Sequence, residues 1–106
     1  MQDTHLIKPV HIYADYRVDV QQVREKYEEL LRASDDWDEK KEPVLEVTNV
    51  TEETIELRAL CSARDPSAAW SFHCWLREEL VGYLRELEDG RYLPRRRIEL
   101  PEQKEE

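Results

Sequence analysis

Glycine is scarce in this sequence of 106 residues, which contains only Gly82 and Gly90. A loop that wraps its backbone amides around a phosphate group needs glycine at a turn between a strand and a helix. Gly82 lies inside a predicted helix and Gly90 at its end, so neither forms such a loop. The serines also lack a base at the spacing of a nucleophilic site. The sequence therefore predicts a protein that is not an enzyme and has no small-molecule substrate.

Positive charge and long apolar runs are also missing. The 16 Lys and Arg residues against 25 Asp and Glu give a net charge of −9, which disfavours binding to nucleic acid and to anionic membranes. No apolar run approaches the roughly 20 residues of a membrane-spanning helix, and the first residues lack the apolar core of a signal peptide. We expect a soluble chain with one domain and one hydrophobic core.

Cysteine and histidine are too few, and too far apart, to build a metal or disulfide site. Cys61 and Cys74 are the only cysteines, and the three histidines share no ligand spacing with them, so neither a metal nor a cofactor is predicted. Asp36 and Asp38 alternate like calcium ligands, but their loop lacks the glycine and the closing glutamate of a calcium-binding loop. We interpret this segment as a solvated loop in which Trp37 folds back as an apolar lid.

Apolar periodicity predicts a domain that spans residues 9–100. Two helices are predicted, from Asp19 to about Ala33 and from Asp65 to Gly90. The predicted strands are Val10–Asp15, Val44–Val50, Glu53–Cys61 and Arg95–Leu100. Residues 1–8 are predicted to be a linker, and residues 101–106 a polar tail.

The order strand, helix, strand, strand, helix, strand is typical of an α+β fold, the ferredoxin-like βαββαβ sandwich. In this fold two helices cover one face of a four-stranded antiparallel sheet. The opposite face of the sheet is then open to water or to a partner.

The second predicted helix carries more apolar surface than one small sheet needs. Beside its core-facing stripe lie Trp70, Cys74 and Val81, and Trp75 projects near Gly82. Because aromatic anchors are enriched in protein interfaces, we predict an interface that contains Trp70, Trp75, Cys74 and Val81. Burial of Trp70 beneath the first helix is the alternative.

Two charged clusters form a predicted electrostatic surface. The acidic one lies in the loop before Pro43 and comprises Asp35, Asp36, Asp38 and Glu39. The basic one lies in the last predicted strand and comprises Arg95, Arg96 and Arg97. Two explanations stay open for the arginines, namely protection of an edge strand from pairing and ion pairs with an acidic neighbour.

The order and spacing of these residues resemble the cytoplasmic α/β domain of the small-conductance mechanosensitive channel family. The resemblance covers nearly the whole chain, and its most specific part runs from Asp65 to Arg95. The matching residues are His11–Tyr16, Val20, Val23, Arg24, Trp37, Leu45–Thr51, Thr54–Leu60, Asp65, Ala69, Trp70, Cys74, Leu76, Arg77, Glu78, Leu80 and Leu93–Arg95.

The resemblance implies a homoheptameric channel that opens under membrane tension. In such a channel this domain lies on the cytoplasmic side of the inner membrane. The α/β domains of the channel join in a hollow vestibule with side portals for ions, where no residue is catalytic. The membrane-spanning helices and the intermediate β domain of that family are absent from this sequence, so we expect an excised domain or a free-standing relative. The alternative is a free-standing ferredoxin-like module that regulates or binds another protein.

Overall fold

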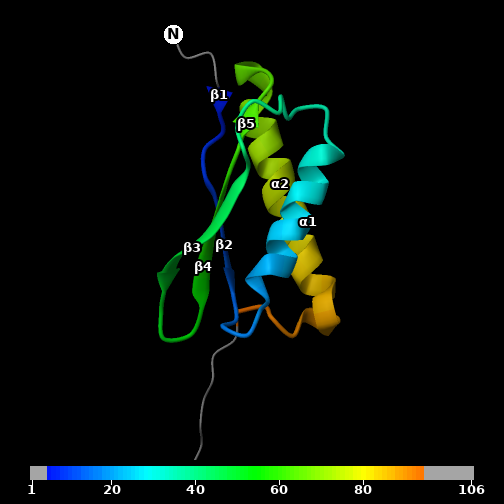
Figure 1. Ribbon diagram of the computed structural model, residues 1–106. Helices are drawn as coiled ribbons and strands as arrows, with labels where there is room; N and C mark the ends of the chain where they lie inside the picture. The colour runs from blue at the N-terminus through cyan, green and yellow to red at the C-terminus, as the bar shows by residue number, and fades with distance from the viewer. Residues whose placement is uncertain (1–4, 95–106) are drawn as a thin grey trace, which may run out of the picture.

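The structure is a computed structural model that describes residues 5–94. Helices α1 (Val20–Arg32) and α2 (Pro66–Glu86) are followed by a short 3-10 helix, η1 (Leu87–Gly90). The strands are β1 (His5–Leu6), β2 (Val10–Ala14), β3 (Val44–Val50), β4 (Ile55–Leu60) and β5 (Ser62–Ala63). Figure 1 shows two layers, with both helices on the same side of the sheet.

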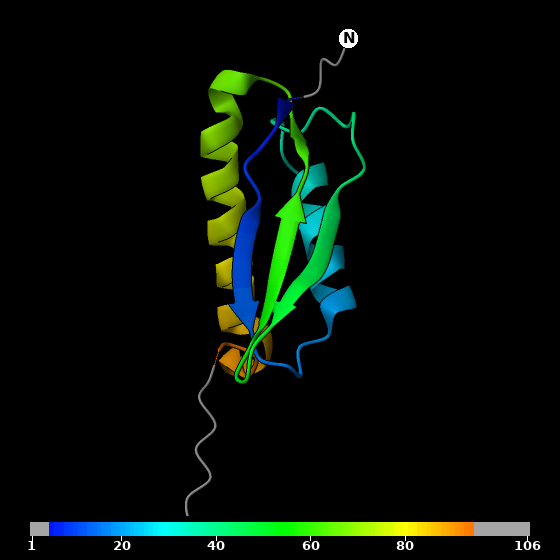
Figure 2. The same ribbon diagram turned by 90° about the vertical axis from the view of Figure 1, so that its left-hand side faces the viewer.

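The main sheet is antiparallel, with the strand order β2-β4-β3. Its apolar residues alternate along β2 and β4, so one face is buried and the other is turned away from the helices. The buried side chains are Val10, Ile12, Ala14, Ile55, Leu57 and Ala59. Figure 2 looks at the opposite face, which no described helix covers.

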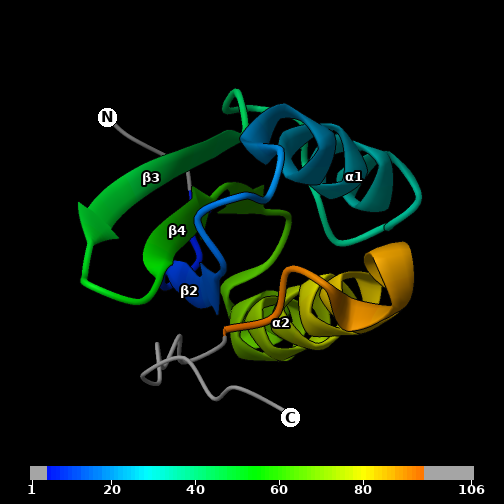
Figure 3. The ribbon, with the colours of Figure 1, turned by 90° about the horizontal axis from the view of Figure 1, so that it is seen from below.

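Strand β3 follows the helical layer only at its start. Leu45 is buried, whereas residues 46–50 are exposed, and the pairing with β4 shifts register between Val47 and Asn49. Such an irregularity increases the local twist of a strand. Figure 3 shows β3 diverging from the helices toward the β3–β4 turn.

Local chemistry starts both helices where the sequence predicts. The Asp19 side chain accepts a hydrogen bond from the Gln21 amide, and Asp65 accepts one from the Ser67 amide. Pro66 occupies the first turn of α2, where its missing amide hydrogen costs nothing. Helix α1 packs on β3 and α2 packs on β2, which encloses a core around Tyr27, Phe72, Leu76 and Leu80.

Helix α2 ends three residues earlier than predicted, because the prediction placed Gly90 just beyond its last residue. The α-helix stops at Glu86, and Glu88 and Asp89 follow with φ of 51° and 59°. Gly90 then adopts φ of 79°, a left-handed conformation that glycine tolerates without strain. The glycine therefore marks the end of a left-handed turn rather than the residue just beyond the α-helix.

The α+β class and the antiparallel sheet are confirmed, but the predicted fourth strand, Arg95–Leu100, lies outside the described residues. The predicted tail at residues 101–106 lies outside them too. The described part of the predicted N-terminal linker belongs to the folded unit: His5 and Leu6 pair with Ala63 and Ser62, and Ile7 is 2% exposed. The prediction missed this pairing because a two-residue strand has no readable period.

Candidate interaction surfaces

An apolar depression lies at the start of α2 and is called the Trp70 groove below. It has a volume of about 350 Å³ and is lined by Leu6, Lys8, Pro66, Ala69 and Trp70. Leu6 comes from β1 and Lys8 from the segment before β2, so the groove depends on the β1–β5 pair. Trp70 is 58% exposed and Leu6 is 52% exposed. Among the described residues, the groove thus combines two exposed apolar side chains with one cation.

Trp70 is held in place by a buried histidine that the sequence did not single out as functional. The two rings stack with centroids 4.8 Å apart and an interplanar angle of 11°. His73 is 2% exposed, and its Nδ1 lies 2.7 Å from the Lys8 carbonyl oxygen. Its Nε2 lies 2.6 Å from a guanidinium nitrogen of Arg77.

These partners fix the state of the His73 ring. The Lys8 carbonyl only accepts hydrogen bonds, so Nδ1 carries the proton and donates it. Arg77 only donates, so Nε2 is the acceptor and the ring is neutral. His73 thereby connects α2 to the segment before β2. In the sequence, this role is indicated only by the i, i+3, i+7 spacing of Trp70, His73 and Arg77, which places the three side chains on one side of the helix.

The structure separates the four predicted interface residues. Val81, 39% exposed, lines a second apolar depression of about 250 Å³ between β2 and the C-terminal half of α2. Cys74 is half-buried. Trp75 is partly buried against the core, with its ring 6.3 Å from that of Phe72. Trp70 is the most exposed of the four, and it is not buried beneath α1.

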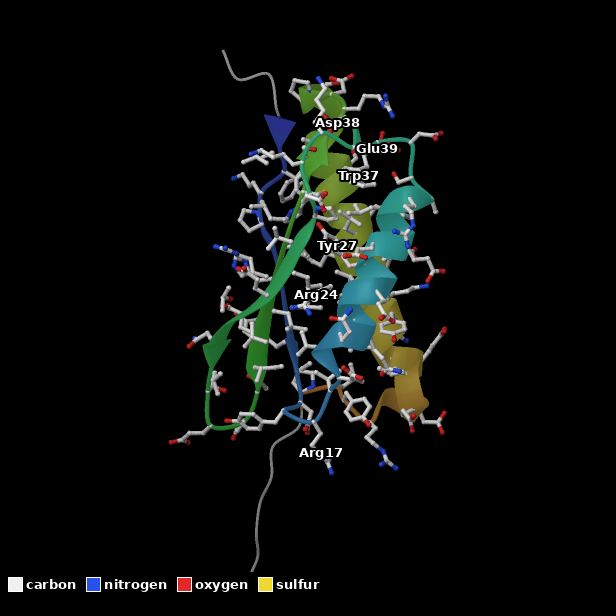
Figure 4. The ribbon with its side chains drawn as sticks, in the orientation of Figure 1. Arg17, Arg24, Tyr27, Trp37, Asp38 and Glu39 are labelled. Carbon is white, nitrogen blue, oxygen red and sulfur yellow. The ribbon has the colours of Figure 1, made fainter. Side chains whose placement is uncertain are left out.

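The acidic loop is held by two residues that follow β4. Arg64 donates from its amide to the Asp36 carbonyl oxygen at 2.7 Å and from its guanidinium to the Asp35 carbonyl oxygen at 2.7 Å. The Ser62 hydroxyl donates to the Asp38 carboxylate. Figure 4 shows Asp38 and Glu39 at one end of the domain and Arg17 at the other. Trp37 is partly buried against the core, which confirms its prediction as an apolar lid.

The four predicted acidic residues divide into two kinds. Asp35 and Glu39 are exposed, whereas Asp36 and Asp38 are partly buried. Partial burial acts to raise the pKa of Asp38, but hydrogen bonds from Ser62 and the Lys40 amide outweigh it and lower the pKa below its ordinary value. Asp38 is therefore a structural anion, and Asp35 and Glu39 present charge to the solvent. The basic cluster, Arg95, Arg96 and Arg97, lies outside the described residues.

The open face of the sheet is polar. The Glu56 carboxylate accepts hydrogen bonds from Thr48 and Tyr13, both at 2.9 Å, and the Thr48 bond and then the Tyr13 bond lower the pKa of Glu56. Away from this open face, Arg24 lies between α1 and β3 (Figure 4). Its guanidinium donates two hydrogen bonds to the Leu45 carbonyl oxygen. In residues 5–94 no group of three or more His, Cys, Asp or Glu side chains is placed to hold a metal ion.

One solved structure with a similar fold is the crystal structure of Helicobacter pylori MscS in its closed state. The similarity covers 97% of this chain with a TM-score of 0.63 and 11% sequence identity. The chain has the fold of part of an MscS channel. It spans 40% of the length of that MscS chain. No protein-family model and no curated protein matches the sequence.

At 11% sequence identity, the similarity to MscS assigns no function to individual residues of this chain. No helix in the described range combines the length and the apolar character that crossing a membrane requires. The described part of the chain has three notable surfaces. They are the apolar groove at Trp70, the exposed acids Asp35 and Glu39, and the polar open face of the sheet.

Proposed function

We propose that this chain is the α/β domain of a mechanosensitive channel of the small-conductance type and that it contributes to subunit assembly and to ion access. The observation that carries the proposal is the structural similarity to MscS over 97% of this chain. A domain of this kind acts through its surfaces, which agrees with an exposed aromatic groove and an exposed acidic loop at the same end of the molecule.

The finer parts of the proposal follow the family resemblance. The domain forms part of a cytoplasmic vestibule in a homoheptamer, and membrane attachment is supplied by helices elsewhere in the channel. Arg95–Leu100 completes the ferredoxin-like sheet as its fourth strand. Among the described strands, β2 pairs only with β4, so its other edge is where the ferredoxin-like order places that strand.

Trp70 is the proposed centre of the contact between neighbouring subunits, with Val81, Cys74 and Trp75 in supporting positions. Large aromatic side chains on a rigid helix are typical interface anchors. Replacing Trp70 by Ala in the full-length protein is expected to weaken the assembled ring by about 2 kcal/mol per contact. Analytical ultracentrifugation of the detergent-solubilised protein measures this loss.

Val50→Ala is the matched control, because Val50 is also 58% exposed and lies at the end of β3. It is expected to leave the assembly unchanged. Equal ring stability in Trp70→Ala, Trp75→Ala and the wild type would remove both tryptophans from the proposed interface.

The proposal as a whole is tested by the reading frame that encodes the chain in its source genome. We expect the frame upstream of Met1 to encode several apolar segments of about 20 residues followed by a β-rich stretch. A stop codon directly before Met1 would instead identify a free-standing regulatory or protein-binding module. For such a module, the Trp70 groove is the surface that favours binding to another protein.

A further inference from the structure

A third depression, called the Gly82 hollow below, lies between α1 and the C-terminal half of α2. It has a volume of about 300 Å³ and is lined by Lys26, Glu78, Glu79, Gly82, Tyr83 and Glu86. Beyond the chain neighbours and the adjacent helix backbone, a Cβ atom added at Gly82 would meet no atom within 4 Å. Glycine destabilises the interior of a helix, and the packing of the described domain does not require it here. The missing side chain leaves room for another molecule to approach the helix backbone closely.

The Gly82 hollow carries more negative than positive charge. Lys26 is the one cation among its lining residues, and its ammonium group already lies 5.7 Å from the centroid of the Tyr83 ring and 4.0 Å from the Glu29 carboxylate. The three glutamates of the hollow form no ion pair or side-chain hydrogen bond within residues 5–94. In the same range they are not placed to hold a metal ion together. The hollow therefore favours an occupant that donates a hydrogen bond and has a positive charge beside it.

Trp70 and Lys8 supply these two groups on the surface of the same chain. In the described range the exposed aromatic side chains are Tyr13, Tyr16 and Trp70. The Tyr13 and Tyr16 hydroxyls donate hydrogen bonds inside the domain, whereas no described residue accepts a hydrogen bond from the Trp70 indole N–H. Lys8 is exposed and lines the groove beside Trp70. A buried tryptophan usually finds an acceptor for its N–H, and the hollow offers three carboxylates.

We propose that Trp70 of one chain inserts into the Gly82 hollow of a second copy, an inference that rests on the proposed subunit contact through Trp70. The indole ring lies against the helix backbone at Gly82, its N–H donates to one glutamate of the hollow, and Lys8 pairs with another. The stack on His73 holds the Trp70 ring in place before binding, so little conformational entropy is lost on association.

Helix geometry requires the hollow to belong to another molecule. Trp70 and Gly82 both lie on α2, and their separation of twelve residues corresponds to about 18 Å along the helix and about 120° around it. No loop movement brings them together, because one helix fixes both. The contact therefore joins two different surfaces, one from each copy. Head-to-tail contacts of this type close into rings when the rotation between copies permits.

Gly82→Leu in the complete chain tests the contact, because the new side chain fills the hollow. The domain leaves space for a side chain there and leucine favours a helix more than glycine does, so we expect an unchanged or higher melting temperature. Ala33→Leu is the matched control, since it adds a leucine at an exposed residue that lines neither the groove nor the hollow. Sedimentation over a range of protein concentrations measures the average mass. We expect the wild type and Ala33→Leu to associate, and Gly82→Leu to need roughly tenfold more protein.

A mixture of two variants tests the head-to-tail arrangement. Trp70→Ala keeps its hollow and Gly82→Leu keeps its tryptophan, so each supplies the surface that the other lacks. We expect each variant alone to associate weakly and the mixture to form a 1:1 dimer and no larger species, because the two remaining surfaces are both defective. The indole N–H resonance of Trp70 in isotope-labelled Gly82→Leu chains, assigned with Trp70→Phe, should shift when Trp70→Ala chains are added.

Three results would overturn the hollow of a second copy as the partner of Trp70. The first is equal association of Gly82→Leu and the wild type. The second is a mixture of the two variants that stays monomeric while the wild type associates. The third is a wild-type chain that remains monomeric at about 1 mM.

These outcomes are separate from the test of the proposed function. If Trp70→Ala abolishes association and Gly82→Leu does not, the Trp70 interface stands and only its partner surface is wrong. If the reading frame upstream of Met1 encodes no apolar segments but association still depends on Gly82, the channel proposal fails and the contact between Trp70 and the hollow stands.

Discussion

The Cys61 thiol illustrates how burial alters one side chain in this domain. Cys61 is 1% exposed, and burial raises its pKa to about 11 from an ordinary value of 9.0, against a smaller lowering by the Tyr27 hydroxyl. A thiol with a raised pKa is more easily ionised in the unfolded chain. The contribution of the protonated Cys61 thiol to the free energy of unfolding is therefore complete below pH 9 and is lost as the pH rises toward 11.

We predict that the free energy of unfolding falls by about 2 kcal/mol between pH 8 and pH 11 because of this residue. Urea unfolding curves across this range measure the effect. Cys61→Ala is the comparison, since both proteins keep Tyr27, whose pKa is also raised by burial and then by Cys61. An identical pH slope in the two proteins would assign the effect to another group.

His73 gives a second prediction at the residue scale. Replacing it by Phe keeps a flat ring beside Trp70 but leaves the Lys8 carbonyl and the Arg77 guanidinium without this partner. We expect a loss of about 1–3 kcal/mol in unfolding free energy. His73→Gln can still donate to Lys8 and accept from Arg77, so thermal unfolding should show a smaller loss. Equal losses would mean that packing, and not hydrogen bonding, explains the histidine.

At the scale of elements, the turn after α2 stores strain at defined positions. A Cβ atom at Gly90 would lie 3.2 Å from the Leu93 Cδ1 atom and 3.3 Å from the Arg85 carbonyl oxygen, at a φ of 79°. We predict that Gly90→Ala destabilises the domain by about 1–2 kcal/mol, and that Glu88→Gly, at a φ of 51°, stabilises it by about 0.5–1 kcal/mol. Thermal unfolding of both variants would contradict this account if their melting temperatures moved in the same direction.

The elements that the sequence predicted well are those with local signals. Asp19, Asp65 and Pro66 start helices through contacts with residues two or three positions away, and β2 and β4 show a clear period of two. The β1–β5 pair joins residues that are 56 or more positions apart in strands of two residues each, so no local pattern reveals it. The Trp70 groove depends on this pair, which is why the sequence identified Trp70 but not Leu6, Lys8 or His73.

The charged loop shows the same limit. The sequence treated Asp35, Asp36, Asp38 and Glu39 as one surface, because all four are acidic and close together. Tertiary contacts separate them, since the partners of Asp38 and of the loop backbone are Ser62 and Arg64, which lie more than twenty residues away. In the sequence, an acid that faces the solvent looks the same as one that is hydrogen-bonded within the domain, because the hydrogen bonds that distinguish them form only on folding.

At the scale of the whole molecule, this division predicts which acids influence ion passage in an assembled channel. Rings of like charge at a pore entrance concentrate ions of the opposite sign. We predict that Asp35→Lys/Glu39→Lys lowers the cation-to-anion permeability ratio of the full-length channel, measured from reversal potentials. Glu52→Lys, in the β3–β4 turn at the other end of the domain, is the control and is expected to leave the ratio unchanged.

Asp38→Lys is expected to behave differently, because it removes the acceptor of the Ser62 hydroxyl and destabilises the loop by about 1–3 kcal/mol. Reduced expression rather than altered selectivity is its expected phenotype. A permeability ratio that is the same in the Asp35→Lys/Glu39→Lys variant and in the wild type would refute a role of this loop in ion access.

We propose that this domain belongs to a channel that opens under membrane tension. The most direct measurement is a patch-clamp recording of the full-length gene product, expressed in bacterial membranes that lack other tension-gated channels, while suction is applied to the patch. We expect a conductance that appears with increasing tension and that is reduced when Trp70 is replaced by Ala. A full-length product that assembles in the membrane but shows no conductance at any tension would contradict it.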